Sequence, residues 1–129
     1  MILVMWLAAT LAAVIHVLIF CMESLWWTRP AVRARFRQSP EQAQTTRLLA
    51  LNQGFYNLFL AIGTFAGLFL VANGYPGVGL VLATWNCLTM VLAAIVLAAS
   101  ARGMWRGAVI QGALPLVFVV LAAWHFAGR

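Results

Sequence analysis

The sequence predicts an all-α, polytopic membrane protein, a bundle of four transmembrane helices. Two observations carry this prediction. First, 65% of the 129 residues are apolar and only 8% are charged, whereas an average soluble domain is about 25% charged. Second, the apolar stretches run without period-two alternation and are long enough for helical crossings of about 20 residues each. This composition excludes a soluble enzyme, a disordered tail and a disulfide-stapled secreted module.

The four helices are expected at residues 2–26, 46–72, 78–100 and 107–127, within one domain covering residues 1–129. The uncharged stretch 48–101 is long enough for two crossings, and the turn-forming residues 73–77 divide it. Arg29-Pro30 ends the first helix. Ser39-Pro40-Glu41-Gln42 predicts a helix start with a capping box. Residues 40–46 then either continue into the second transmembrane helix or form a short interfacial turn.

The arginines indicate the orientation. Seven of the eight basic residues lie in or beside the connections 27–45 and 101–106, and the eighth is Arg129. The positive-inside rule therefore predicts that both connections are cytoplasmic and both termini lie outside a bacterial inner (plasma) membrane. Arginines at these places contact anionic lipid head groups, so we expect membrane lipids as partners and no nucleic acid.

Polar side chains interrupt the cytoplasmic half of each expected helix. His16 and Glu23 are seven residues apart, two turns on one face of the first helix. The other helices contribute Asn52, Gln53, Tyr56 and Asn57, then Asn86, then Gln111, whose carbonyl is freed by Pro115. Because such groups are costly in hydrocarbon, we expect a shared pocket open to the cytoplasm or the inner leaflet. Two structural roles are the alternatives to a pocket: the amides only join neighbouring helices, and Glu23 pairs with a loop arginine.

Such a pocket predicts a protein that binds or transports a small amphipathic molecule. The amides would orient the ligand, and transport could be coupled to a proton carried by Glu23 or His16. An alternative is an intramembrane enzyme, in which His16 and Glu23 transfer protons on a lipidic substrate, as an isomerase does, and Tyr56 stabilises an oxyanion. A third reading is an accessory subunit of a larger membrane complex. The sequence leaves open whether the chain is an enzyme.

No metal or other cofactor is expected. His16 and His125 differ by roughly 15 Å in depth, too far to hold one haem, and His16 with Glu23 is a poor ligand set for a metal. The expected partners are lipids and a small-molecule ligand. Gly63 and Gly67 form a small-xxx-small face that favours close helix contact, within the chain or in a homo-oligomer.

The chain also resembles a known family. The run Leu-Asn-Gln-Gly-Phe-Tyr-Asn-Leu-Phe-Leu-Ala at residues 51–61 follows His16, Glu23 and Trp26. With Phe36, the Ser39-Pro40-Glu41 start and Gln-Gly-Ala-Leu-Pro at 111–115, it resembles the bacterial "domain of unknown function 1304" family over nearly the whole chain. The resemblance implies a small four-helix inner-membrane protein without an established biochemical role. Its motif positions fall on His16, Glu23, Asn52, Gln53, Tyr56, Asn57 and Gln111.

Overall fold

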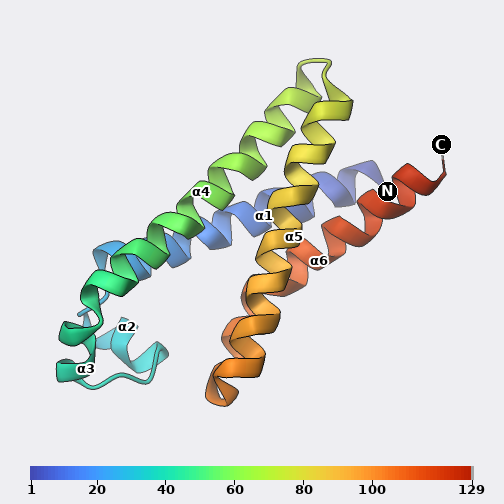
Figure 1. The fold of residues 1–129 in the computed structure, drawn as a ribbon. Coiled ribbons are helices and arrows are strands. Elements are labelled where there is room, and N and C mark those ends of the chain that lie inside the picture. The colour runs from blue at the N-terminus through green and yellow to red at the C-terminus, as the bar shows by residue number, and fades with distance from the viewer. Residues whose placement is uncertain (129) are drawn as a thin grey trace.

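The computed structural model describes residues 1–128 as helices joined by short turns (Figure 1). The elements are α1 (Ile2–Phe20), a π-helical turn η1 (Cys21–Leu25), α2 (Pro30–Arg35), α3 (Pro40–Thr45), α4 (Arg47–Ala72), α5 (Pro76–Ser100), a 3₁₀ turn η2 (Arg102–Met104) and α6 (Trp105–Ala127). No strand occurs in this part of the chain. The predicted all-α class is confirmed.

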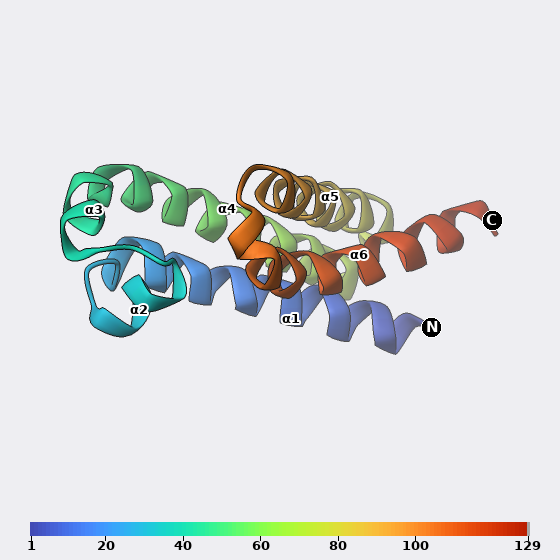
Figure 2. The same cartoon turned by 90° about the horizontal axis from the view of Figure 1, so that it is seen from below.

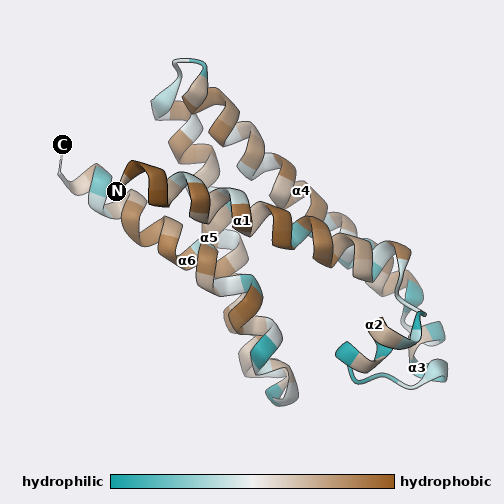
Figure 3. Cartoon of the chain, turned by 180° about the vertical axis from the view of Figure 1, so that it is seen from behind, coloured by the Kyte–Doolittle hydropathy of each residue, from teal (hydrophilic) through white to brown (hydrophobic). Residues whose placement is uncertain are grey.

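Four helical segments are long and apolar enough to cross a membrane: Ile2–Leu25, Arg47–Ala72, Pro76–Ser100 and Arg102–Ala127. Large apolar side chains on them point outward, among them Leu7, Phe59 and Trp85. Outward-facing apolar side chains are expected where lipid is the solvent. Figure 3 shows that hydrophilic residues gather in the connections and that the long helices are predominantly hydrophobic. The chain is a multi-pass membrane protein, as predicted.

The four long helices form a ring in which α1 and α5 lie diagonally opposite each other. Helix α1 packs against α4 and α6, and α5 packs against the same two helices. Helices α2 and α3 lie at one end of α1 and α4, and the α5–α6 turn is at the same end of the bundle (Figures 1 and 2). This end, formed by residues 26–47 and 101–106, is called the arginine-bearing end below.

Small residues bring the helices together. The main core cluster combines several alanines with Met90 and Phe118: Ala8, Ala9, Ala12, Ala83 and Ala122. A Cβ added at Gly67 would lie 2.7 Å from the backbone nitrogen of Ala83 and 2.7 Å from the carbonyl oxygen of Gly79. The small-residue face of α4 therefore contacts α5 of the same chain, which is one of the two arrangements that the sequence left open.

The connection between α1 and α4 contains more helix than expected. Pro30 stands at the start of α2, a helix that the sequence analysis missed, although proline suits the first helical position. The capping box at α3 is present as predicted: Ser39 N–H donates to Gln42 Oε1 at 2.9 Å, and Gln42 N–H donates to Ser39 Oγ at 3.2 Å. Thr46 separates α3 from α4, so residues 40–45 form a short helix of their own.

Candidate functional site

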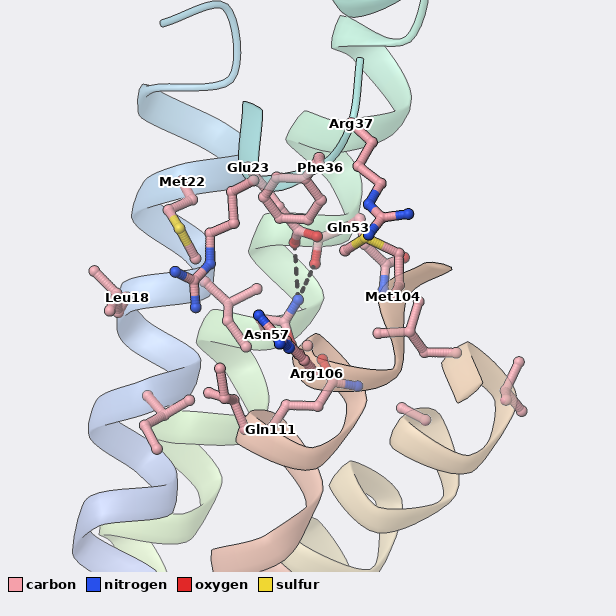
Figure 4. Close-up of a pocket in the computed structure, with 18 of the residues that line it drawn as sticks. Leu18, Met22, Glu23, Phe36, Arg37, Gln53, Asn57, Met104, Arg106 and Gln111 are labelled. Carbon is pink, nitrogen blue, oxygen red and sulfur yellow. Dashed lines mark hydrogen bonds between the residues drawn. The ribbon is translucent and has the colours of Figure 1, made fainter. Parts of the chain in front are cut away.

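A cavity of about 740 Å³ lies at the arginine-bearing end of the bundle (Figure 4). All four membrane-crossing segments and the α2 region line it. Its aliphatic walls come mainly from α1 and α5, including Leu18, Ile19, Val96 and Leu97. Its polar groups include Glu23, Gln53, Asn57 and Gln111. The cavity is thus mostly apolar with a few convergent polar groups, which is the usual composition of a small-molecule site.

A hydrogen bond between Glu23 and Asn57 forms the polar centre of the cavity wall. Asn57 Nδ2 donates to Glu23 Oε2 at 2.9 Å and to the Gln53 carbonyl at 3.1 Å. Both side chains are only 9% exposed. A carboxyl group at such a place needs a hydrogen-bond donor to offset its lost hydration. The two residues are 34 positions apart in sequence and stand on different helical segments, so their bond also holds the wall in shape.

The π-helical turn η1 directs Glu23 toward the cavity. Trp26 N–H donates to the Cys21 carbonyl at 3.0 Å, five residues earlier. The cavity face of α1 contains Ile15 and Ile19, and His16 lies about 100° around the helix from Ile15. A π turn contains more residues per turn than an α-helix, so each residue advances by less than 100°. This difference rotates Glu23 away from the His16 side and back toward the Ile15–Ile19 face.

Gly54 allows α4 to approach this turn closely. A Cβ at Gly54 would collide with Ser24 Oγ and lie 3.2 Å from Glu23 Cβ. Ser24 Oγ in turn donates to the Leu51 carbonyl at 3.0 Å. The close approach sets Asn57, almost one turn further along α4, against Glu23. Sequence reasoning missed Gly54 and Ser24, although a glycine inside a polar helical run was a signal for a helix contact.

Four expected pocket residues do not line the cavity: His16, Asn52, Tyr56 and Asn86. His16 is 1% exposed, and its Nδ1 lies 2.8 Å from the Ala12 carbonyl in the same helix. Asn86 is buried, donates to the Leu82 carbonyl at 2.8 Å, and packs where a Gly63 Cβ would be. Tyr56 is 64% exposed and lies outside the cavity lining. Of these expected groups, α5 brings none to the cavity, because the Asn86 amide packs against Gly63 of α4.

The polar arc of α4 is divided between two faces. Gln53 and Asn57 line the cavity, whereas Asn52 and Tyr56 are exposed on other parts of the helix surface. His16 and Tyr56 both lie outside the cavity that contains Glu23. The arrangement required by the enzyme hypothesis, with all three side chains around one small volume, is absent from the described residues.

Several cavity residues were not anticipated from the sequence. Arg35, Arg37 and Arg106, called the mouth arginines below, line the cavity together with Ser100. The sequence analysis assigned the arginines to topology, to contact with lipid head groups and, as an alternative, to pairing of a loop arginine with Glu23. The available signal was the position of Arg106, five residues before Gln111 in the same helix.

A second, smaller cavity of about 160 Å³ lies toward the other end of the bundle. Its lining is almost wholly apolar and includes Met5, Leu68, Phe118 and His125. Within residues 1–128, no side chain lines both cavities. Fully buried side chains of α4 and α5, Thr64, Cys87 and Met90, belong to neither lining. The two cavities are therefore separate.

Comparison with known proteins gives one match. The family described as "Protein of unknown function (DUF1304)" matches residues 10–123, a range that contains every polar residue of the larger cavity. No curated protein and no solved structure matches the chain. The function must therefore be argued from the cavity itself.

Proposed function

The chain belongs to the DUF1304 family of proteins of unknown function, and we propose that it binds or transports a small amphipathic molecule in the larger cavity. The observation that supports this proposal is the meeting of the Glu23–Asn57 pair with Gln53 and Gln111 on one hollow with aliphatic walls. Its volume, about 740 Å³, is within the range of roughly 300–1,000 Å³ found for small-molecule sites.

The polar groups would orient the ligand, and the aliphatic walls would bind its apolar part. Asn57 engages Glu23 Oε2, so Oε1 is available to a donor on the ligand. The amides of Gln53 and Gln111 each carry both a donor and an acceptor. Because these groups stand on three different segments of the chain, a ligand that contacts all of them would also hold α1, α4 and α6 together.

We further propose that the arginine-bearing end faces the cytoplasm of a bacterial inner membrane, with both termini on the other side, by the positive-inside rule. A ligand would then enter from the cytoplasm or from the inner leaflet. Transport to the other side would require the buried layer of Thr64, Cys87 and Met90 to open, because the two cavities share no lining residue.

The experiment is native mass spectrometry of the purified full chain after incubation with a lipid extract. Ala93 lines the cavity, whereas Ala99 in the same helix is exposed and lies outside it. We expect an adduct of defined mass on the wild type and on Ala99→Phe. The adduct should be lost in Ala93→Phe, which projects a phenyl ring into the cavity, and reduced in Glu23→Gln. Equal occupancy in Ala93→Phe and Ala99→Phe, with both variants folded by circular dichroism, would refute the proposal.

Asn52 and Tyr56 favour a second candidate function, contact with another membrane protein. They are exposed and one turn apart on α4. An amide that faces lipid is stabilised when a protein partner supplies a hydrogen bond. A photoreactive residue at position 56 should then give a discrete cross-linked product in membranes. The control is position 59, where Phe59 is also exposed. The same pattern of products from both positions would contradict this candidate.

A further inference from the structure

We propose that the ligand has an anionic head group, a phosphate or a carboxylate, bound by the mouth arginines; this inference rests on the proposed function. The cavity lining contains three arginines and one carboxyl group, Glu23. The chain has only two acidic residues, and the other, Glu41, lies outside the lining. Three positive charges against at most one negative charge leave a formal charge of at least +2 at the mouth.

The side chains that line the cavity fit a molecule with a charged head group and an apolar body. Arg35 ends α2, and Arg37 follows it in the connection. Arg106 lies in the first turn of α6, about 7.5 Å nearer the helix start than Gln111 at 1.5 Å per residue. Figure 4 shows Arg37 and Arg106 among the side chains around Glu23 and Asn57. The arginines and the amides therefore line the same hollow, which has aliphatic walls as well.

The backbone at Arg37 supports a role for its side chain. Arg37 has a φ of 55°, in the left-handed region. Gln38 N–H donates to the Arg33 carbonyl at 2.9 Å and Arg37 N–H to the Ala34 carbonyl at 3.3 Å. This pattern is a Schellman motif, whose left-handed position is usually glycine. An arginine at a position that suits glycine is a backbone outlier, and such outliers are concentrated at functional sites.

The Arg37 side chain crosses the mouth of the cavity. Its Nη1 is the atom nearest to a Cβ built on Gly103, at 2.6 Å, so the guanidinium packs on the backbone of η2. Arg37 thus extends from the end of α2 to the α5–α6 turn. A guanidinium presents several N–H donors in a planar fork, which matches the oxygens of a phosphate or carboxylate. An anion at the mouth would therefore bridge α2 and α6 through Arg37 and Arg106.

The same charge argues against a cationic amphiphile, because like charges at one site repel. Arginines that only attract the bulk membrane surface provide the control. Arg102 is exposed at the start of η2 and lies outside the cavity lining. It has the same charge as Arg106 and lies four residues before it in the chain. Loss of Arg102 should weaken general attraction to anionic lipid without changing binding in the cavity.

The test uses the full chain in nanodiscs of neutral phosphatidylcholine, with bound probe counted by native mass spectrometry. The probes are dodecyl phosphate, dodecanol, dodecyltrimethylammonium and inorganic phosphate. We expect one dodecyl phosphate per chain, with dodecanol at least tenfold weaker and the cationic probe weaker still. Arg106→Gln and Arg37→Gly should each weaken dodecyl phosphate binding by about tenfold, the effect of one charge-assisted hydrogen bond. Arg102→Gln should match the wild type.

The outcomes separate the two proposals. Inorganic phosphate that displaces dodecyl phosphate would support a site for a free anion, and failure to displace it would support a lipid head group as the source. Suppose that dodecanol and dodecyl phosphate bind equally, and that Arg106→Gln leaves this binding unchanged while Ala93→Phe abolishes it. That result would overturn the proposal of an anionic head group and would leave the cavity proposal standing. If Ala93→Phe changes the binding of no probe, the proposed function fails as well. Glycine suits the left-handed backbone at position 37, and the unfolding free energy of Arg37→Gly separates a folding defect from loss of the anion site.

Discussion

The substitution Gly54→Ala tests whether the close approach of α4 to the π-helical turn builds the cavity wall. The new methyl group would collide with Ser24 Oγ and lie 3.1 Å from the Ser24 backbone nitrogen and 3.2 Å from Glu23 Cβ. The hydroxyl of Ser24 can rotate away, but the other two contacts require movement of the backbone. The expected response is a small separation of α4 from η1, which stretches the hydrogen bond between Glu23 and Asn57.

The magnitude can be worked out from three contributions. Overpacking a tight contact costs about 1–3 kcal/mol. Loss of the bond from Ser24 to the Leu51 carbonyl adds about 0.6 kcal/mol, the average for polar contacts between membrane helices. Replacing glycine by alanine inside a helix returns about 0.8–1 kcal/mol through better helix propensity. Together these values predict a net destabilisation of about 0.6–2.8 kcal/mol for Gly54→Ala.

The assay is reversible unfolding in mixed micelles with increasing sodium dodecyl sulfate, followed by circular dichroism. Gly77→Ala is the matched control, because Gly77 is also helical and a Cβ there would have no neighbour within 4 Å. We expect Gly77→Ala to be neutral or slightly stabilising and Gly54→Ala to unfold at lower detergent fraction. If the two variants unfold together, the glycine does not set the contact between α4 and η1, and the account of the cavity wall is wrong.

Three further predictions follow from other contacts. Gly67→Ala should destabilise the fold more than Gly54→Ala in the same assay. Its new methyl group would meet backbone atoms of Gly79 and Ala83 at 2.7 Å, and backbone atoms cannot rotate away. An equal or smaller loss of unfolding free energy than in Gly54→Ala would contradict this. Arg37→Gly should leave the unfolding free energy unchanged or raise it by up to about 1 kcal/mol, because it relieves a left-handed backbone; a clear loss would mean that the Arg37 side chain stabilises the fold. The pKa of Glu41 should lie below its ordinary value of 4.5. Its own backbone N–H, the Ser39 side chain and the charge of Arg33 all favour the carboxylate. This stabilisation of the start of α3 is present above pH 4.5 and is lost as the pH falls through the lowered pKa. Carbon NMR of Glu41 should show a higher titration midpoint in Ser39→Ala than in the wild type. Equal midpoints in the two proteins would exclude the Ser39 contribution.

The helical architecture was accessible from the sequence because it depends on composition and local signals. Apolar stretches without charge identify membrane crossings whatever their packing. The α3 capping box was also predictable, since Ser39 and Gln42 satisfy each other within one turn. Helix α2 was missed because Pro30 was read only as the end of the first helix. The same residue type ends one helix and begins another, and local sequence does not separate the two roles.

The candidate site was only partly accessible, for a different physical reason. Helical periodicity places polar residues on a face, but it does not say whether a side chain reaches across the bundle or bonds to its own backbone. Asn86 and His16 both engage the carbonyl four residues earlier, and a helical wheel does not show this choice. Asn57 also engages the carbonyl four residues earlier, but its amide reaches Glu23 as well, because Gly54 brings the two helices together. The left-handed backbone at Arg37 depends on tertiary structure in the same way.

The π-helical turn at Cys21–Leu25 has a consequence for how such a chain can change over generations. The turn accommodates one residue more than a regular α-helix would hold between the two flanks. A single-codon deletion there would let the backbone close into an ordinary turn, with the flanking segments still in register and the span still long enough for the bilayer. If the deleted codon is that of Glu23 or of a later residue of the turn, the product would keep the architecture and lose the carboxyl group from the hollow. Length variation at this one place is therefore the most direct genetic route by which descendants of this protein could abandon the site without abandoning the fold.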